Sequence, residues 1–499
     1  MLDVSVVVRA FGGQERLDLT LASLAAQSYP VGLMEVVVVD DGSEPPIRLP
    51  EVRPPHTRIV VVPPGGWGPA RAVRAGTDAS SGAVVLRLDA GIEVAPVHVE
   101  AQMRWHHLAD HLAVLGGVVR AGGGDGVGCG EPDASCGPEA AEGEWAADTA
   151  GADRLRTAGH RAWQAFAGTA WSVRRELLAE CGGMDPGLLL GEDTHLGYRL
   201  AQRGAVFVPE PAATGRRPGG PRPEDRPEEA DRFGAPFLEN RVPRRHSRRV
   251  SPGREWQVPC VDVVVEVSGV VFEVVSDTVE RVLGGDVADV RVTLVGEWRR
   301  VSAGGRHAVL DDPDVELRLV REAFRCESRV VFAEEVPRAD PDVPFRLFLL
   351  AGLPVGSGAV RTLTAAADAR DAGVVLVRGT GGGTAAMRLE REAAFARARR
   401  LGATGPELDV TVAELWGEHD VDRDEVLTGH RPGEEGPPAD WHRRMRRAAR
   451  AADRNRAAAD RWERRIRVLV RGRGVRLLLG RPVRGSRVRR TRRGAISAV

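Results

Sequence analysis

Short valine-rich runs alternate with stretches of helical spacing near the start of the chain. Residues 4–8 and 36–39 are too short for helices and too apolar for exposed strands, so they predict buried parallel strands. Between them, from Arg16 to Ala26, leucine and alanine recur at helical spacing. A strand, a helix and a second strand in this order predict a right-handed βαβ unit.

The same alternation continues to about residue 215, with glycine- and proline-rich turns between the elements. The runs expected as strands are 59–62, 83–88 and 205–208. The stretches expected as helices are 69–79, 97–111, 172–181 and 198–202. This order is typical of an open α/β sheet, in which ligands bind at the carboxyl ends of the strands.

The second half of the chain repeats the first half faintly. Three of its segments resemble earlier ones in the same order: 261–265, 290–295 and 372–376 resemble 4–8, 36–39 and 82–86. Where acids follow the earlier strands, the repeat has Gly296 and Gly379. We expect a duplicated α/β domain without chemistry, although chance similarity between two βαβ patterns is the alternative.

The length of 499 residues predicts two to four domains. We expect a first α/β domain over residues 1–215 and a linker rich in proline and arginine over 216–258. A second, degenerate α/β domain over 259–430 and an arginine-rich helical tail over 436–499 complete the expected organisation.

The net charge of zero conceals a polarised chain. The whole sequence has 70 basic and 70 acidic residues, and every basic residue is arginine. Residues 441–499 contain 21 arginines and only three acids, so this segment carries +18 and the preceding residues carry −18. Such asymmetry indicates either an anionic partner or packing of the tail on the acidic body.

The basic tail also has a seam with alternating spacings of four and three residues, as in a coiled coil. The seam consists of Trp441, Met445, Ala448, Ala452, Asn455, Ala459, Trp462, Ile466 and Leu469. Packing on the body or self-association is favoured, and contact with an anionic membrane surface comes second because the seam is rich in alanine. Nucleic-acid binding is not expected, since no recognition fold accompanies the basic run.

Several classes of protein are excluded or disfavoured by composition. No apolar run is long enough for a membrane-spanning helix, and the first residues lack the pattern of a signal peptide. Five scattered cysteines without a CxxC pair favour neither a disulfide framework nor a zinc site. We expect a cytoplasmic protein, peripheral at the inner face of the membrane if the tail binds lipid.

Acidic residues stand beside the predicted elements at three places in the first domain. Asp40 and Asp41 follow the second strand, Asp89 follows a later strand, and Glu192 and Asp193 precede a helix. Two of these places have a structural alternative: the first pair is typical of a turn, and the last pair suits the N-terminal dipole of a helix.

Three blocks, taken in order and spacing, resemble the family 2 glycosyltransferases, which are inverting enzymes of the GT-A fold. The blocks run from Val4 to Ser43, from Gly82 to Asp89, and from Gly182 to Leu200. The resemblance covers about the first 215 residues. It implies a Rossmann-like, nucleotide-sugar-binding domain, followed here by the degenerate GT-A-like domain and the basic helix.

The resemblance also implies roles for single residues. Asp40 or Asp41 would contact the base or ribose of a nucleotide-sugar donor, because a carboxylate accepts strong hydrogen bonds from N–H and hydroxyl groups. Arg71 and Arg74, on the helix after the glycine-rich turn, would contact the diphosphate. The alternative for both arginines is a solvated helix face.

Asp89 occupies the first position of the family's Asp-x-Asp motif, which holds a divalent cation such as Mg²⁺ or Mn²⁺. The motif here reads Asp89-Ala90-Gly91, so the second acid is missing, and Glu93 lies two residues further on. The histidine that the family often has after its last strand is absent from residues 209–217. Either Asp89 and Glu93 bind a metal with waters and phosphates, or metal binding has been lost.

Glu192 and Asp193 match the family's Glu-Asp pair, in which the Asp is the usual general base. An inverting transfer needs such a base to take the proton of the acceptor hydroxyl. The absence of a Gln-x-x-Arg-Trp motif argues against a processive synthase.

The sequence therefore predicts a non-processive, inverting glycosyltransferase that uses a nucleotide-diphosphate sugar and an unknown hydroxyl acceptor. Such an enzyme would suit cell-envelope or polysaccharide biosynthesis. The alternative is an inactive pseudo-glycosyltransferase that acts as a binding or scaffold protein.

Overall fold

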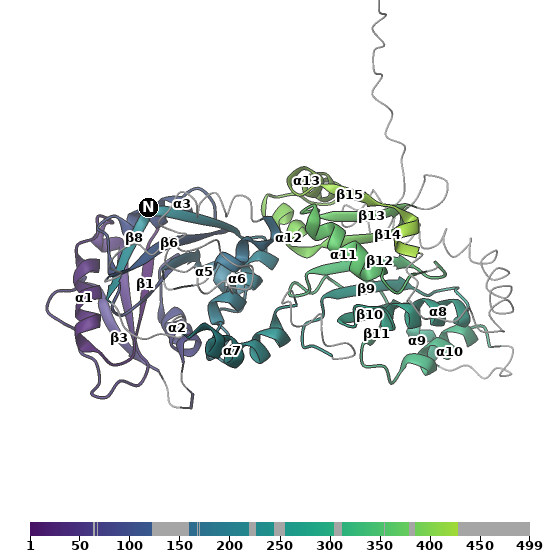
Figure 1. Cartoon of the computed structure of the whole chain (residues 1–499), viewed down its shortest axis with the longest axis horizontal. Coiled ribbons are helices and arrows are strands. Elements are labelled where there is room, and N and C mark those ends of the chain that lie inside the picture. Colours follow the sequence, from purple (N-terminus) through teal and green to yellow (C-terminus); the bar gives the residue numbers. More distant parts are fainter. Residues whose placement is uncertain are drawn as a thin grey trace, which may run out of the picture.

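The computed structural model describes residues 1–62, 65–66, 68–121, 159–166, 168, 170–218, 226–243, 255–303, 312–353, 355–378 and 385–427. These residues form two α/β domains that lie side by side along the long axis of the molecule (Figure 1). The mixed α/β class expected from the sequence is confirmed.

The first domain is built on an eight-stranded mixed sheet with the order β3-β2-β1-β4-β7-β6-β8-β5. Its strands are β1 (Val4–Ala10), β2 (Met34–Asp40), β3 (Thr57–Val61), β4 (Val84–Asp89), β5 (Glu93–Val94), β6 (Leu112–Ala121), β7 (Trp171–Arg174) and β8 (Val206–Pro218). Strands β3, β2, β1 and β4 are parallel, whereas β7 runs antiparallel to both β4 and β6. The expected βαβ unit therefore lies at the parallel side of the sheet.

Helices cover both faces of this sheet. They are α1 (Gln14–Ala25), α2 (Pro69–Ala79), α3 (His98–His106), α5 (Arg175–Glu180), α6 (Glu192–Gln202) and α7 (Pro227–Arg241), with the 3₁₀ helices η1 (Val31–Leu33) and η3 (Gly159–Ala165). Residues of α1 and α3 share one apolar core with β1, β2 and β4. Residues of α2, α5, α6, α7 and η3 share the core on the opposite face.

Successive side chains of β4 point alternately into the two apolar cores on opposite faces of the sheet. Val84, Leu86 and Leu88 belong to the core beside α1 and α3, and Val85 belongs to the core beside α2 and α6. Because successive side chains of a strand point to opposite faces, Arg87 lies on the same face as Val85. The α6 face of the sheet thus receives a charged side chain from an otherwise apolar strand.

The second domain has a seven-stranded sheet with the order β11-β10-β9-β12-β14-β13-β15. Its strands are β9 (Val261–Glu266), β10 (Val290–Val295), β11 (Val330–Ala333), β12 (Phe345–Leu350), β13 (Val374–Arg378), β14 (Ala385–Arg391) and β15 (Glu418–Val421). Its helices are α8 (Phe272–Leu283), α9 (Trp298–Ala303), α10 (Val315–Phe324), α11 (Ala359–Ala369), α12 (Glu392–Arg400), α13 (Glu407–Leu415) and α14 (Arg423–Leu427).

The two sheets share one topology over seven strand positions, and β5 is an additional edge strand of the first sheet. β14 is antiparallel to both β12 and β13, and β13 is parallel to β15, as β7 is antiparallel to β4 and β6, and β6 is parallel to β8. The registers also correspond, because Val261 lies opposite Phe345 as Val4 lies opposite Val84. A helix starts directly after β14 as one does after β7.

One expected correspondence between the halves is wrong. Residues 372–376 were expected to match 82–86, but they lead into β13, which holds the sheet position of β6. The counterpart of β4 is β12, and the register places Leu350, rather than Gly379, at the position of Asp89. Short valine runs occur in several strands of both sheets, so similarity of such runs does not identify the strand.

Two other expectations differ from the structure. The segment 227–241, expected within a linker, forms α7, which packs on the first domain through Leu238 and the adjoining Val242. The segment 172–181, expected as one helix, begins with most of β7 and continues as α5. In both places a short apolar pattern was obscured, by Pro236 and charged neighbours in α7 and by the direct strand-to-helix junction after β7.

The arginine-rich tail, 436–499, lies outside the described residues, so the predicted coiled-coil seam stays a prediction. Among the helices that the structure does describe, none is long and apolar enough to span a membrane.

Candidate active site

The charged residues of the first domain gather where parallel strands end. Arg9 lies near the end of β1 and Asp89 at the end of β4, and the register places them directly opposite each other. The Arg9 Nε donates a hydrogen bond to Asp89 Oδ1 over 3.3 Å. Two strands that are 80 residues apart in sequence thereby bring a guanidinium group to the first acid of the predicted Asp-x-Asp motif.

Arg87 is the centre of the cluster. Its side chain is 3% exposed and forms ion pairs with Asp89 at 3.6 Å and with Glu192 at 3.5 Å. It also donates a hydrogen bond to Asp193 Oδ2. One buried guanidinium group therefore joins three of the acids that the sequence singled out.

Trp171 holds the second oxygen of Asp193. Its indole Nε1 donates to Asp193 Oδ1 over 3.1 Å. Trp171 and Arg87 are register partners on the antiparallel strands β7 and β4, so both side chains reach the same carboxylate from the sheet. Each oxygen of Asp193 thus accepts a hydrogen bond from a different strand.

The start of α6 delivers the two adjacent acids. The preceding Gly191 has φ of 78°, a left-handed conformation that suits glycine, and a Cβ there would lie 2.5 Å from a methyl of Leu238 on α7. Glu192 and Asp193 occupy the first turn without a side-chain cap hydrogen bond. They therefore meet the positive end of the helix dipole and the buried Arg87 together.

Burial sets the proton affinity of this pair. Desolvation, followed by the charge of Asp193, raises the pKa of Glu192 to about 7. Desolvation also raises the pKa of Asp193, against the opposing charge of Arg87. The charges of Asp193, Asp89 and Glu192 outweigh burial at Arg87 and raise the pKa of its guanidinium, which stays protonated.

Asp41 reaches the same region from β2. Burial raises its pKa, while the charge of Arg9, a hydrogen bond from the backbone of Gly68 and the charge of Arg71 act in the opposite direction. Arg9 therefore acts on Asp41 as well as on Asp89, and Arg71 of α2 is near enough to Asp41 to affect its pKa. The predicted residues Asp41, Arg71, Asp89, Glu192 and Asp193 are brought together in one charged network.

Asp40 has a turn-forming role instead. Its Oδ1 accepts a hydrogen bond from the backbone N–H of Ser43 over 2.9 Å, and its Oδ2 accepts one from Ile47 over 3.4 Å. The side chain is buried. The turn interpretation therefore describes the contacts of Asp40, and Asp41 is the acid beside the charged groups.

Arg74 is likewise held away from the cluster. It forms an ion pair with Asp78 one turn further along α2, at 2.9 Å, and it donates to the carbonyl of Gly182 over 2.5 Å. These contacts join α2 to the turn after α5, whereas Arg71 is near Asp41.

Glu93 is the second acid expected at the metal site. It is exposed in the edge strand β5, where its register partner is Arg216 of β8. Among the described residues, no group of three or more His, Cys, Asp or Glu side chains is arranged to hold a metal ion. Within the described part of the chain, Asp89 and Glu93 therefore have no third protein ligand for a divalent cation, which needs several oxygen ligands.

Arg87 and Trp171 are the members of the site that the sequence analysis missed. A signal for Arg87 exists in the sequence, because it is the only charged residue between Val84 and Leu88 in a strand predicted to be buried. Trp171 carries no comparable signal, since its role depends on the pairing of β7 with β4.

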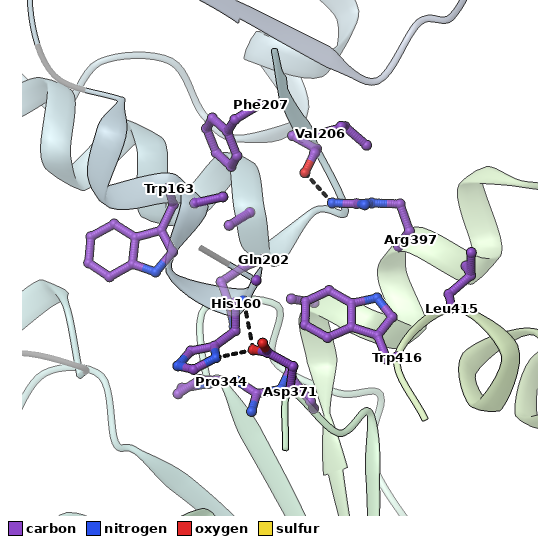
Figure 2. A pocket seen from close by; sticks show the side chains of 16 residues that line it. His160, Trp163, Gln202, Val206, Phe207, Pro344, Asp371, Arg397, Leu415 and Trp416 are labelled. Atoms are coloured by element: carbon purple, nitrogen blue, oxygen red, sulfur yellow. Dashed lines mark hydrogen bonds and ion pairs between the residues drawn. The ribbon is translucent and has the colours of Figure 1, made fainter. Parts of the chain in front are cut away.

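A separate cavity of about 400 Å³ lies between the two domains. Figure 2 shows Trp163 and Gln202 of the first domain facing Trp416 and Asp371 of the second. The backbone N–H of His160 donates to Asp371 Oδ1 over 3.0 Å, and the His160 ring also contacts that oxygen. None of the acids around Arg87 lines this cavity. Two of them, Glu192 and Asp193, lie at the start of α6, whereas Gln202 lies at its end.

Comparison with known proteins gives the class of the first domain. Residues 5–129 match the family model described as Glycosyl transferase family 2. The resemblance seen in the sequence is confirmed for these residues, which match a family 2 glycosyltransferase domain. No curated protein sequence matches the chain significantly.

Several solved glycosyltransferase structures resemble the chain. Mannosyltransferase PcManGT from Pyrobaculum calidifontis, in complex with GDP-Man and Mn²⁺, has 21% identity and a TM-score of 0.31, with 44% of this chain and 59% of that chain covered. GalNAc-T7 with UDP, GalNAc and Mn²⁺ has 22% identity and a TM-score of 0.33, with 44% of each chain covered. S. aureus TarS in complex with UDP-GlcNAc has 18% identity and a TM-score of 0.33, with 44% of this chain and 60% of that chain covered. The chain therefore spans roughly half the length of these proteins.

Proposed function

We propose that this protein is an inverting, non-processive glycosyltransferase that uses a nucleotide-diphosphate sugar. The observation that carries the proposal is the meeting of Asp89, Glu192 and Asp193 around Arg87, next to Asp41. These acids come from three distant stretches of a family 2 glycosyltransferase domain. Their position at the carboxyl ends of parallel strands is where open α/β sheets bind ligands.

In the proposed reaction each group has one task. Asp41 accepts hydrogen bonds from the nucleoside, and Arg9 and Arg71 face the diphosphate. Asp193, oriented by Trp171 and Arg87, takes the proton of an acceptor hydroxyl while that oxygen bonds to the anomeric carbon. The bond from the anomeric carbon to the nucleoside diphosphate breaks on the opposite face, so the configuration inverts.

The second domain is proposed to be a degenerate copy that does not bind the donor. With Val4 aligned to Val261, the register places Glu266 at the position of Arg9 and Phe348 at that of Arg87. Leu350 stands at the position of Asp89. The charges that make the first site are therefore replaced at each of these strand positions.

A binding or scaffold function is the second candidate, and one observation favours it. Both oxygens of Asp193 already accept hydrogen bonds, from Trp171 and Arg87. The Arg87 guanidinium opposes the rise in the pKa of Asp193 that burial causes, so Asp193 is a weaker base than burial alone would make it. A protein that keeps the fold for recognition alone would retain such a closed network.

Nucleotide binding and catalysis are tested separately. Thermal unfolding with a panel of nucleoside diphosphates should show stabilisation by one of them, because a ligand of the native state raises the melting temperature. Asp41→Ala should abolish that response. Asp193→Asn should keep the response but lower transfer from the matching sugar nucleotide by at least about 100-fold, the usual contribution of a general base.

The matched control is Asp409→Asn in the second domain. Asp409 lies in the first turn of α13 and is buried beside Arg388 of β14, much as Asp193 is buried beside Trp171. This variant should transfer sugar at the normal rate. Unchanged transfer in Asp193→Asn would remove that residue from the role of base, and binding without any transfer in the unaltered protein would favour the scaffold.

A further inference from the structure

The first acid of the Asp-x-Asp motif is already paired with two positive groups. Asp89 Oδ1 lies 3.3 Å from Arg9 Nε and 3.6 Å from Arg87 Nη2. The Asp89 side chain is 6% exposed. One oxygen of this carboxylate is therefore bordered by two guanidinium groups.

A divalent cation would have to compete with those groups. The motif position that would supply the second carboxylate is Gly91, and hard cations need several oxygen ligands. A cation beside Asp89 would stand within a few ångströms of two positive charges, which repel it. The residues around Asp89 therefore favour an arginine side chain, rather than a bound metal ion, as the positive group at this site.

Charge balance supports the same view. Arg9 and Arg87 bring two positive charges to Asp89, Glu192 and Asp193, which bring at most three negative ones. Arg87 neutralises the acids from the sheet side, while Arg9, at 26% exposure, is the more accessible of the two. An approaching diphosphate would therefore meet Arg9 before Arg87.

We propose that Arg87, together with Arg9, replaces the divalent metal of this domain, so that the site binds a nucleoside diphosphate without a metal. Arg87 is a positioning residue that holds the three acids, and Arg9 meets the diphosphate. The inference rests on the proposed function, because it concerns the same donor site.

A purely structural role for Arg87 is the competing explanation, and the second domain supplies its example. Arg388 of β14 is 0% exposed and forms ion pairs with Glu390 at 2.6 Å and with Asp409. It belongs to a domain without the donor-site charges. A test must therefore give a result for Arg87 that Arg388 does not share.

The test uses the full chain and thermal unfolding with Mn²⁺ alone. The substitution Arg87→Met removes the guanidinium group. Asp89, Glu192 and Asp193 then surround the vacated space, and their carboxylate oxygens are ligands that Mn²⁺ accepts. Saturating Mn²⁺ should raise the melting temperature of this variant by roughly 5 °C. The unaltered protein and Arg388→Met should not respond.

A second measurement needs no variant. The nucleoside diphosphate that stabilises the unaltered protein should do so equally with EDTA and with Mn²⁺. Loss of that response in EDTA would overturn the inference, and so would a folded Arg87→Met that Mn²⁺ leaves unchanged. If Arg87→Met does not fold, the EDTA comparison decides.

The two proposals fail in different ways. If no nucleotide stabilises the unaltered protein under any condition, the proposed function fails. The change in melting temperature of Arg87→Met on adding Mn²⁺ still shows whether the Arg87 side chain occupies a position that a metal ion can take.

Discussion

Glu192 is the acid of the site whose charge changes near neutral pH. Its carboxyl is buried at the start of α6, 3.5 Å from Arg87 and next in sequence to Asp193. The raised pKa of about 7, against 4.5 for an ordinary glutamate, is caused first by burial and then by Asp193. Folding therefore favours the protonated form of this side chain.

That preference predicts a pH-dependent stability. Between pH 4.5 and 7 the native protein keeps a proton on Glu192 that the unfolded chain releases, so the free energy of unfolding falls as pH rises through this window. The loss reaches about 3 kcal/mol at full deprotonation. Glu192→Gln should remove this part of the decline, measured by urea unfolding at a series of pH values.

The control for this measurement is Glu176→Gln, on the exposed side of α5. It should decline with pH like the unaltered protein. A Glu192→Gln variant whose stability falls just as steeply would contradict the assignment of this proton to Glu192.

Single residues of the site were predictable only where a motif names them. Asp41, Asp89, Glu192 and Asp193 stand at the ends of predicted elements, where polar residues follow apolar runs. Arg87 stands inside a strand, and its meaning comes from α6 lying on that face of the sheet. Such a contact joins residues about 100 positions apart, which no local pattern reports.

At the scale of elements, Gly76 allows α2 to pack directly against β1 and β2. A Cβ on this glycine would lie 2.4 Å from Val7 Cγ1 and 2.7 Å from Val39 Cγ2. Because Gly76 has no side chain, α2 can lie against these valines, and this contact sets the position of the helix that carries Arg71.

Gly76→Ala should destabilise the protein although the substitution normally favours a helix. Alanine gains about 1 kcal/mol in helix propensity over glycine, but overpacking against two valines of β1 and β2 costs roughly 1–3 kcal/mol. We expect a lower melting temperature and weaker nucleotide stabilisation, both measured by thermal unfolding.

Gly32→Ala is the matched control, because a Cβ at Gly32 meets no atom within 4 Å. It should leave stability nearly unchanged. Gly76→Ala as stable as Gly32→Ala would show that the helix moves away from the sheet at little cost.

Strands with a continuous run of apolar residues were predicted from the sequence, but the order in which strands pair in the sheet was not. The valine runs identified β1, β2, β9 and β10, because buried parallel strands are apolar throughout. β7 was read as part of a helix, since four residues that continue directly into α5 leave no turn between them. Its antiparallel pairing with β4 is set by the tertiary fold, which also places Trp171 in the site.

At the scale of the whole molecule, α12 of the second domain packs against α6 of the first (Figure 1). Arg397 of α12 donates to the carbonyl of Gly204 over 2.5 Å and to that of Ala205. Burial alone lowers the pKa of Arg397 to about 10. The side chain therefore satisfies two carbonyls at the end of the helix that begins with Glu192.

Arg397→Met should loosen this contact. Two buried carbonyls would lose their donor, at a cost of roughly 1–3 kcal/mol, so backbone amides around residues 200–207 should exchange with solvent about tenfold faster. Hydrogen–deuterium exchange followed by mass spectrometry measures this change.

Arg399→Met provides the comparison, because Arg399 pairs with Glu392 within the same helix and is about half exposed. Its exchange should match that of the unaltered protein. Equal exchange in both variants would mean that Arg397 does not hold the domains together.

The contact between the two domains involves helices that hold equivalent positions beside the two sheets. Partners in a twofold dimer touch through the same surface on each. Here α12 contacts α6, and Arg400 at its end forms an ion pair with Glu180 of α5, the counterpart of α12 after β7. The helices that follow the corresponding strands β7 and β14 therefore meet each other, as equivalent helices of a symmetric pair would.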